Sequence, residues 1–143
     1  MKIKNFNQRY PAEALPPIVA IIDEYGLLTS LMNKKEREMF EQDLSALAAA
    51  ARSVGIHLII ATQHPSAEVI TPTIKANLDA RIALRVASSI YSRVVLETQG
   101  AEHLLGHGDM LFRRPDGSII RLQAPFIDED KIPDLLRMIK ARF

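Results

Sequence analysis

The sequence predicts an α/β fold, with a mainly parallel sheet flanked by helices and a β-hairpin near the C-terminus. Two apolar runs of strand length, residues 18–22 and 56–61, are separated by a helical pattern, which is the order of a βαβ unit. A Pro115-Asp116-Gly117 turn between two further apolar runs predicts the hairpin. With 143 residues, 48% of them hydrophobic, the chain has the size and composition of one folded domain.

The first half of the chain is predicted to form a strand, a long helix and a second strand. The run Ile18–Ile22 is apolar without alternation, which favours a strand buried on both faces of a parallel sheet. Asn33, with a glutamate three residues later, has the spacing of a capping box, and an apolar helical stripe continues to Gly55. Residues 56–61 predict the second buried strand, in which His57 is expected to lie in the core.

The second half is predicted to contain shorter elements. They are a helix over residues 73–77, a strand over 81–86, a helix over 89–97, the hairpin over 106–126 and a final helix. Asp128 is expected to cap this last helix, whose apolar face is formed by Ile132, Leu135, Leu136 and Ile139. Residues 1–17, which contain three prolines, are predicted to be a lead-in segment without a core of its own.

The composition excludes several kinds of site, and the net charge does not indicate nucleic-acid binding. The chain has 18 basic and 17 acidic residues, so a net charge of +1 leaves only a local basic patch to contact DNA. It has no cysteine, which excludes disulfides and thiolate metal sites and favours a cytosolic setting. No apolar run reaches the roughly 18–20 residues of a membrane helix, and no secretory signal is visible at the N-terminus.

Two carboxylates follow the first strand. The run IVAIIDE ends in Asp23 and Glu24, which is the pattern of a Walker B strand. Ligands of parallel α/β sheets bind at the carboxyl ends of strands, where an aspartate can hold Mg²⁺ through water and a second carboxylate can orient or deprotonate an attacking water. Thr62 and Gln63 end the next strand and can hydrogen-bond to a γ-phosphate. The alternative is an ordinary solvated strand end or helix cap.

The phosphate-binding half of an ATP site has no counterpart in these residues. None of the six glycines begins the P-loop pattern G-x-x-x-x-G-K-[ST]. Phosphate affinity comes mainly from the P-loop amides and its lysine. The chain by itself is therefore expected not to hydrolyse ATP appreciably.

Three arginines are candidates for a finger that stabilises charge on the transferring phosphoryl group. Arg52 lies near a predicted helix end, and Arg81 and Arg85 bracket a predicted strand. A surface ion pair is the alternative for each of them. The four histidines lack the spacing of metal ligands.

Four runs, taken in order, resemble the FtsK/SpoIIIE family of DNA translocases. They are LPPIVAIIDEYG (15–26), residues 51–88 with the motif ATQ-x-P-S, SRVVLETQGAEHLLGHGDML (92–111) and APFI (124–127). The resemblance covers roughly residues 15–130. It implies a partial RecA-like P-loop NTPase fold in which residues 18–143 are the C-terminal half of a motor domain. It further implies a hexameric ring on double-stranded DNA, with ATP between adjacent subunits.

The resemblance also implies roles for individual residues. Asp23 matches the aspartate that binds Mg²⁺ and Glu24 the catalytic glutamate, while Thr62 and Gln63 match the position that senses the γ-phosphate. Arg52 is the first candidate for a finger acting on a neighbouring subunit, and Arg81 and Arg85 are its alternates. The implied cofactors are ATP and Mg²⁺.

This sequence departs from the family pattern in two respects. His64 stands where the ATQ-x-P motif usually has arginine, so a phosphate or DNA contact there would become pH-sensitive. The family's P-loop strand and helix are expected upstream of such a segment. Full-length relatives are anchored to the bacterial inner membrane and move chromosomes during division or sporulation. The chain itself is expected to carry no such anchor and to be cytoplasmic.

Two other functions remain open from the sequence. The chain could be a non-catalytic interaction module that docks on motor subunits or on DNA, in which case an exposed strand edge should pair with another chain. A metal-dependent hydrolase using Asp23 and Glu24 ranks last, because no further carboxylate suggests a two-metal site. For DNA, residues 66–75 are expected to form the contact loop, with Lys75 touching backbone phosphate.

Overall fold

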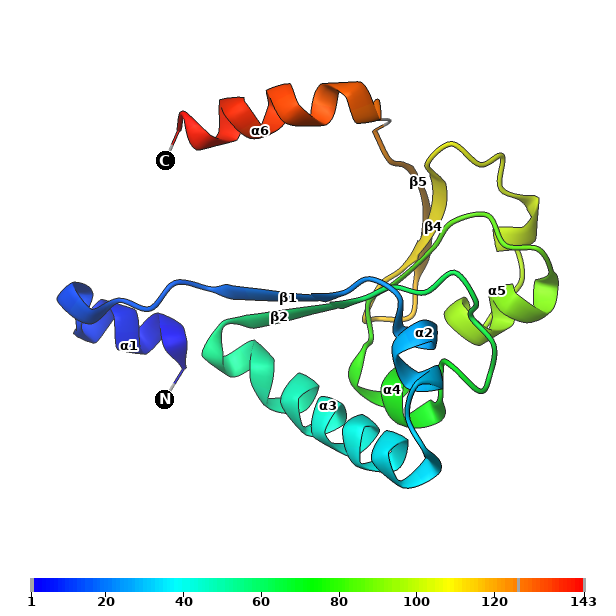
Figure 1. Ribbon diagram of the computed structural model, residues 1–143, viewed down its shortest axis with the longest axis horizontal. Coiled ribbons are helices and arrows are strands. Elements are labelled where there is room, and N and C mark those ends of the chain that lie inside the picture. Colours follow the sequence, from blue (N-terminus) through cyan, green and yellow to red (C-terminus); the bar gives the residue numbers. More distant parts are fainter. Residues whose placement is uncertain (1, 126, 143) are drawn as a thin grey trace.

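The structure is a computed structural model that describes residues 2–125 and 127–142, apart from the side chain of Arg52. Its strands form two separate sheets (Figure 1). A parallel pair consists of β1 (Ile18–Ile22) and β2 (Ile56–Ile60). An antiparallel sheet consists, in order, of β3 (Arg81–Ala83), β4 (Asp109–Arg113) and β5 (Ile119–Gln123). The α/β class and the C-terminal hairpin are confirmed, and parallel pairing is confined to β1 and β2.

Helices connect and cover these strands. They are α1 (Ile3–Arg9), α2 (Tyr25–Ser30), α3 (Lys34–Val54), α4 (Pro72–Asn77), α5 (Ser89–Leu96) and α6 (Ile132–Lys140), with 3-10 turns at Pro11–Glu13, Ala101–His103 and Glu129–Lys131. The sequence did not predict α1 or α2. Each of the two is at most seven residues long, which is too short for helical periodicity to appear.

Helix α3 sets the parallel register of β1 and β2. The predicted capping box is confirmed: Asn33 Oδ1 accepts from Glu36 N at 3.0 Å, and Glu36 Oε2 accepts from Asn33 N at 2.9 Å. The helix ends at Gly55, whose φ of 76° lies in the left-handed region that glycine adopts without strain. The Gly55 carbonyl then accepts from Ile18 N at 2.9 Å, so β2 starts level with β1.

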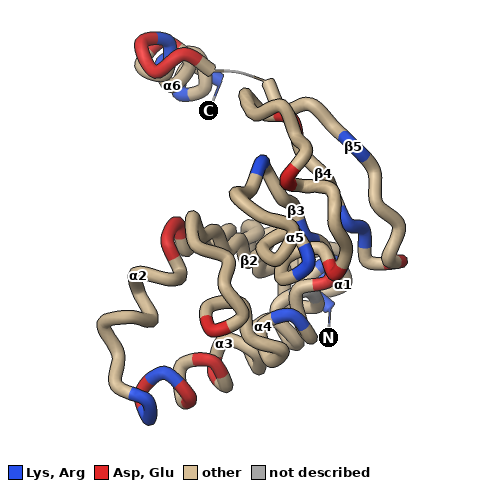
Figure 2. Tube along the Cα trace, turned by 90° about the vertical axis from the view of Figure 1, so that its right-hand side faces the viewer, with Lys and Arg blue, Asp and Glu red and all other residues tan. Residues whose placement is uncertain are grey.

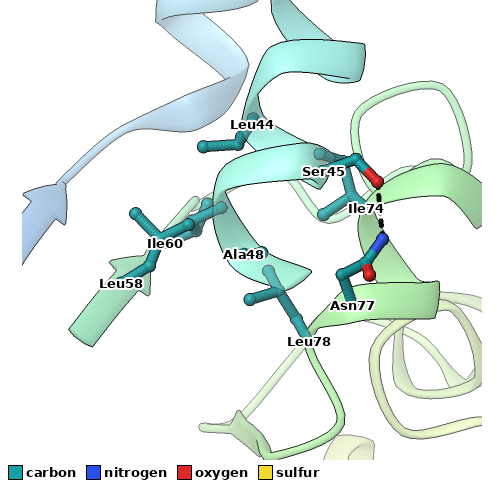
Figure 3. Close-up of a pocket in the computed structure, with 8 residues that line it drawn as sticks. All are labelled: Leu44, Ser45, Ala48, Leu58, Ile60, Ile74, Asn77 and Leu78. Carbon is teal, nitrogen blue, oxygen red and sulfur yellow. Dashed lines mark hydrogen bonds between the residues drawn. The ribbon is translucent and has the colours of Figure 1, made fainter. Parts of the chain in front are cut away.

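The main core lies between α3, α4 and one face of the parallel pair. Tyr25, Leu44 and Ile74 are buried there, with Ile22 of β1 packed against them. Figure 3 shows where α4 meets α3 and β2, around Leu44, Ser45, Ala48, Leu58, Ile60, Ile74, Asn77 and Leu78. The Asn77 amide donates to Ser45 Oγ at 2.5 Å, which ties the two helices together at the rim of this core.

A second, smaller core lies under the antiparallel sheet. Its buried members are Ala83, Leu96, Ala101 and Leu104. The Ser92 hydroxyl, which is fully buried, donates to the Thr98 carbonyl at 2.8 Å and accepts from Ala101 N at 3.1 Å. These bonds fix the chain where it leaves α5, so α5 and the following turn pack as one unit.

The parallel pair is covered on only one face, so the prediction that its strands are buried on both faces is wrong. Val19 pairs with His57 and Ile21 with Ile59, and all four side chains are exposed. Ile21 keeps 66% of its surface exposed and Ile59 keeps 50%. His57 is therefore not a core histidine. In Figure 1, α3 lies along one side of the strands, and α6 stands apart on the other side.

The uncovered sheet face and the exposed helix α6 (Ile132–Lys140) both add to the surface of the molecule. The exposed area is 10625 Å². A compact monomer of 16.0 kDa is expected to expose about 7,400 Å². The molecule therefore exposes roughly 3,000 Å² more than its mass predicts. Contiguous exposed apolar patches mark protein or membrane contact sites, ligand grooves or aggregation-prone surface.

The final helix is confirmed, but it begins later than the sequence suggested. Asp128 makes no capping hydrogen bond and precedes a 3-10 turn, and α6 starts at Ile132 with Lys131 before it. None of the residues of α6 is buried, and its apolar side chains are at least two-fifths exposed. Within the part of the chain that the structure describes, no helix combines the length and the apolar character that a membrane crossing requires.

A charge-assisted clamp holds the base of the hairpin. The Asp109 carboxylate is buried and accepts from Arg121 Nε at 2.9 Å and from a second guanidinium nitrogen at 2.6 Å. It also accepts from Leu105 N at 2.8 Å. The hydrogen bonds from Arg121 and from Leu105 N lower the pKa of Asp109 from 3.8 to about 2.

This clamp predicts a dependence of stability on pH. Because the folded pKa is depressed, the stabilisation is complete above the unfolded value of 3.8 and is lost as the pH falls through about 2. We expect Asp109→Asn to unfold at lower urea concentration than wild type at pH 7, and the difference to shrink between pH 4 and pH 2. Asp134→Asn, at an exposed surface pair, serves as the control. A difference that does not change with pH would contradict the assignment.

Candidate active site

The predicted acidic pair lies at the carboxyl end of β1. Asp23 directly follows the strand and is exposed, and Glu24 caps the N-terminus of α2. Two backbone hydrogen bonds hold the ends of the two strands together. Ala61 N donates to Ile22 O at 2.8 Å, and Tyr25 N donates to Ala61 O at 2.9 Å. The residues after β1 and the residues after β2 therefore meet at one edge of the sheet.

Glu24 bridges the two strand ends. Its Oε1 accepts from the Thr62 hydroxyl at 2.6 Å and from Gly26 N at 3.1 Å, and its Oε2 accepts from Gln63 N at 2.7 Å. These hydrogen bonds, led by the one from Thr62, lower the pKa of Glu24. The structure thus brings together three predicted residues that are 38 and 39 positions apart in the sequence.

The carboxylate chemistry of this edge fits a nucleotide-bound Mg²⁺ better than a protein-caged metal. In the described residues, no group of three or more His, Cys, Asp or Glu side chains converges as a metal site. Mg²⁺ keeps several waters and needs only one or two carboxylates beside the phosphates of its nucleotide. The exposed carboxylate of Asp23 meets that requirement, whereas the Glu24 carboxylate already accepts three hydrogen bonds from the protein.

The three candidate arginines have different surroundings. Arg52 belongs to the last turn of α3, and its side chain lies outside what the structure describes. Arg81 is held within the protein: it donates to the Leu78 and Lys75 carbonyls at 2.9 Å and pairs with Glu97 at 3.0 Å. The side chain of Arg85 is exposed, and no ion pair of Arg85 is found among the described residues.

Lys75 belongs to α4, and the hollow that it lines includes neither Asp23 nor Glu24. With Arg81 and Arg113 it lines an open hollow of about 420 Å³, which Asp79 and Glu97 also line. Glu97 pairs with both arginines, and these ion pairs lower its pKa. In Figure 2 basic and acidic segments lie interspersed along the trace, so the positive charge at the hollow is local.

Gly26 is a site residue that the sequence analysis did not single out. A Cβ added to it would lie 3.1 Å from Glu24 Oε1 and 3.2 Å from Thr62 Oγ1. Both contacts are tighter than most Cβ contacts, so a side chain at this position would press on the two oxygens. The feature of the sequence that could have identified Gly26 is its position, two residues after the acidic pair and at the start of the helix.

The fold and the placement of the acidic pair define a partial RecA-like P-loop NTPase fold of the kind found in motor ATPases. The model of the FtsK/SpoIIIE family matches residues 6–67. The chain is 46% identical over 143 residues to the DNA translocase FtsK of Caldanaerobacter subterraneus and 42% identical over 144 residues to that of Helicobacter pylori. The chain belongs to the FtsK/SpoIIIE family.

These matches cover nearly the whole chain and a small part of each relative. They span 99% of this chain and 20% of the Caldanaerobacter protein, and 98% of this chain and 16% of the Helicobacter protein. The chain thus corresponds to a fifth or less of the curated relatives.

Solved structures support the same fold. The pCW3 conjugation coupling protein TcpA, in its monomer form with ATPγS, superposes with a TM-score of 0.82 at 33% identity, over 99% of this chain and 42% of that protein. The cytoplasmic domain of the Thermomonospora curvata type VII secretion ATPase EccC gives a TM-score of 0.75 at 23% identity, over 90% of this chain and 15% of that one, and shows the fold alone.

Proposed function

We propose that this chain supplies the hydrolysis and γ-phosphate-sensing residues of an ATP-driven double-stranded DNA translocase motor. Residues 18–143 then act as the C-terminal half of its RecA-like motor domain, and residues 1–17 as a lead-in segment. The observation that carries the proposal is the position of Glu24, which joins Thr62 and Gln63 at the carboxyl ends of two parallel strands. The similarity to FtsK proteins supports the same function.

The residues divide the chemistry among them. Asp23 would hold Mg²⁺ through water, and the ion would neutralise charge on the phosphates of ATP. Glu24 orients an attacking water and accepts its proton, while the polar pair after β2 supplies the position from which the γ-phosphate is sensed. A finger from a neighbouring subunit stabilises the transferring group. Arg52 is the first candidate. Of its alternates, Arg85 fits better than Arg81, whose guanidinium is held by Glu97 and backbone carbonyls.

The larger assembly follows from the same proposal. The motor works as a hexameric ring around DNA, and Lys75 contacts backbone phosphate from the hollow it shares with Arg113. Such a contact depends on salt concentration and carries little base specificity. The proposed role of the motor is to move chromosomes during division or sporulation. Its membrane anchor would lie outside this segment.

Nucleotide binding by this chain tests the proposal. Calorimetry with Mg²⁺ and a slowly hydrolysed ATP analogue is expected to detect no binding, because the P-loop amides and lysine that supply phosphate affinity are absent from these 143 residues. Asp23→Ala is the control for any signal. Stoichiometric binding that is lost in Asp23→Ala would overturn the proposal that the phosphate-binding residues are supplied from elsewhere. The chain would then hold nucleotide by itself.

A second candidate function is a non-catalytic module that docks on motor subunits or DNA. The uncovered face of β1 and β2 and the excess exposed surface favour it. Dimers or larger species in sedimentation runs, reduced by Ile21→Glu but not by Leu105→Glu at another highly exposed position, would support it. A clean monomer at high concentration would count against it.

A further inference from the structure

The hydrogen bonds of Thr62 are already committed within the protein. Its hydroxyl donates to Glu24 Oε1 at 2.6 Å and accepts from His64 N at 3.2 Å. A hydroxyl has one proton to donate. A phosphate oxygen can only accept, so in this arrangement Thr62 has no proton left for a γ-phosphate.

We propose that Thr62 is a positioning residue for Glu24, and that of the polar pair after β2 only Gln63 is left to meet the γ-phosphate. The hydroxyl of Thr62 fixes one oxygen of the Glu24 carboxylate, and the backbone N–H of Gln63 fixes the other. The Gln63 side chain itself is exposed at this edge. The inference rests on the proposed function for the role of Glu24, but the contact it describes is independent of nucleotide.

Counting acceptor positions shows what this contact achieves. An ionised carboxylate offers about four hydrogen-bonding positions on its two oxygens. Gly26 N, Thr62 Oγ1 and Gln63 N fill three of them. One position remains, which suits a single water held at a defined angle. The three donors therefore fix the orientation of the carboxylate.

The close approach at Gly26 supports a site built around this bond. A side chain there would crowd both Glu24 Oε1 and Thr62 Oγ1. Thr62 is also partly buried, so water competes less for its hydroxyl than at an exposed threonine. The surroundings therefore favour the hydrogen bond between Thr62 and Glu24, which differs in this respect from a contact between two exposed side chains.

The test is a carboxyl titration of Glu24 by NMR in the full chain without nucleotide, with Glu24→Gln used to assign the resonance. In Thr62→Val, which keeps the shape and removes the hydroxyl, the titration midpoint of Glu24 is expected to rise. In Thr62→Ser, which restores the hydroxyl, it is expected to return to the wild-type value. Thr71→Val removes an equivalent bond to Glu41 and is expected to leave Glu24 unchanged.

Two outcomes would overturn the proposal: a midpoint that does not move in Thr62→Val, or one that Thr62→Ser fails to restore. If Thr62→Val does not fold, the wild-type hydroxyl proton provides a second measurement. It is expected to be protected from exchange and to lose that protection in Glu24→Ala; an unprotected proton in wild type would also overturn the proposal. Because no ATP is present, a failure of the proposed motor function leaves these results unchanged.

Discussion

Replacing Glu24 with glutamine is expected to reduce ATP hydrolysis about 100- to 10,000-fold in a motor that contains this segment together with a P-loop. Glutamine has the size of glutamate but cannot accept a proton from water. It also places an amide N–H where Glu24 now receives a backbone or hydroxyl donor. Nucleotide affinity is expected to change little, because the phosphates are held by the P-loop and Mg²⁺.

A chimera makes this measurement possible. The 143 residues can replace the matching segment of the Caldanaerobacter DNA translocase, to which they are 46% identical. Steady-state hydrolysis and analogue binding are then compared for the chimera with and without Glu24→Gln. Glu13→Gln, an exposed glutamate in the lead-in segment, is the matched control. If the Glu24→Gln chimera hydrolyses ATP at the wild-type rate, Glu24 does not have the catalytic role.

Replacing Tyr25 with alanine is expected to lower the free energy of unfolding by about 3–5 kcal/mol. Tyr25 is fully buried, and its ring stacks on Phe40 with 6.2 Å between ring centroids. Truncation leaves a cavity between α2 and α3 as well as losing the burial of the ring. Because Tyr25 follows Glu24, the loss also loosens the start of α2, where the carboxylate is held.

Tyr25→Phe separates the contribution of the ring from that of the hydroxyl. The hydroxyl is buried and has no hydrogen-bond partner among the residues the structure describes. Burial, with the charge of Glu41 nearby, raises the pKa of Tyr25 to about 12. Removing the hydroxyl is therefore expected to change stability by less than about 1 kcal/mol in urea unfolding at pH 7. A phenylalanine variant as unstable as the alanine variant would show that the hydroxyl, and not the ring, holds this core.

Local signals predicted most of the fold. The capping box at Asn33, the left-handed Gly55 and the Pro115-Asp116-Gly117 turn each act within a few residues, and each is found where the sequence placed it. The coverage of the sheet could not be predicted in the same way. An apolar strand shows that its side chains avoid water, but not which polypeptide covers them, and Ile21 and His57 are exposed.

The candidate site was predictable in its location and not in its contacts. An acidic pair after a buried strand and a polar pair after the next one must meet when the strands are parallel. The bond from Thr62 to Glu24 depends on side-chain distances that no spacing in the sequence encodes. Arg81 shows the same limit: its spacing fits a finger, but the contacts to Glu97 and two carbonyls depend on the folded surroundings of β3.

The uncovered face of β1 and β2 is expected to affect how long the protein persists in a cell. Chaperones and proteases recognise exposed apolar side chains, and unshielded strands are also prone to aggregate. Val19, Ile21 and Ile59 are exposed, and molecules in which they stay in water are expected to be removed first. The steady-state amount of this chain should follow the supply of whatever polypeptide packs on that face, so its abundance would be set by assembly as well as by synthesis.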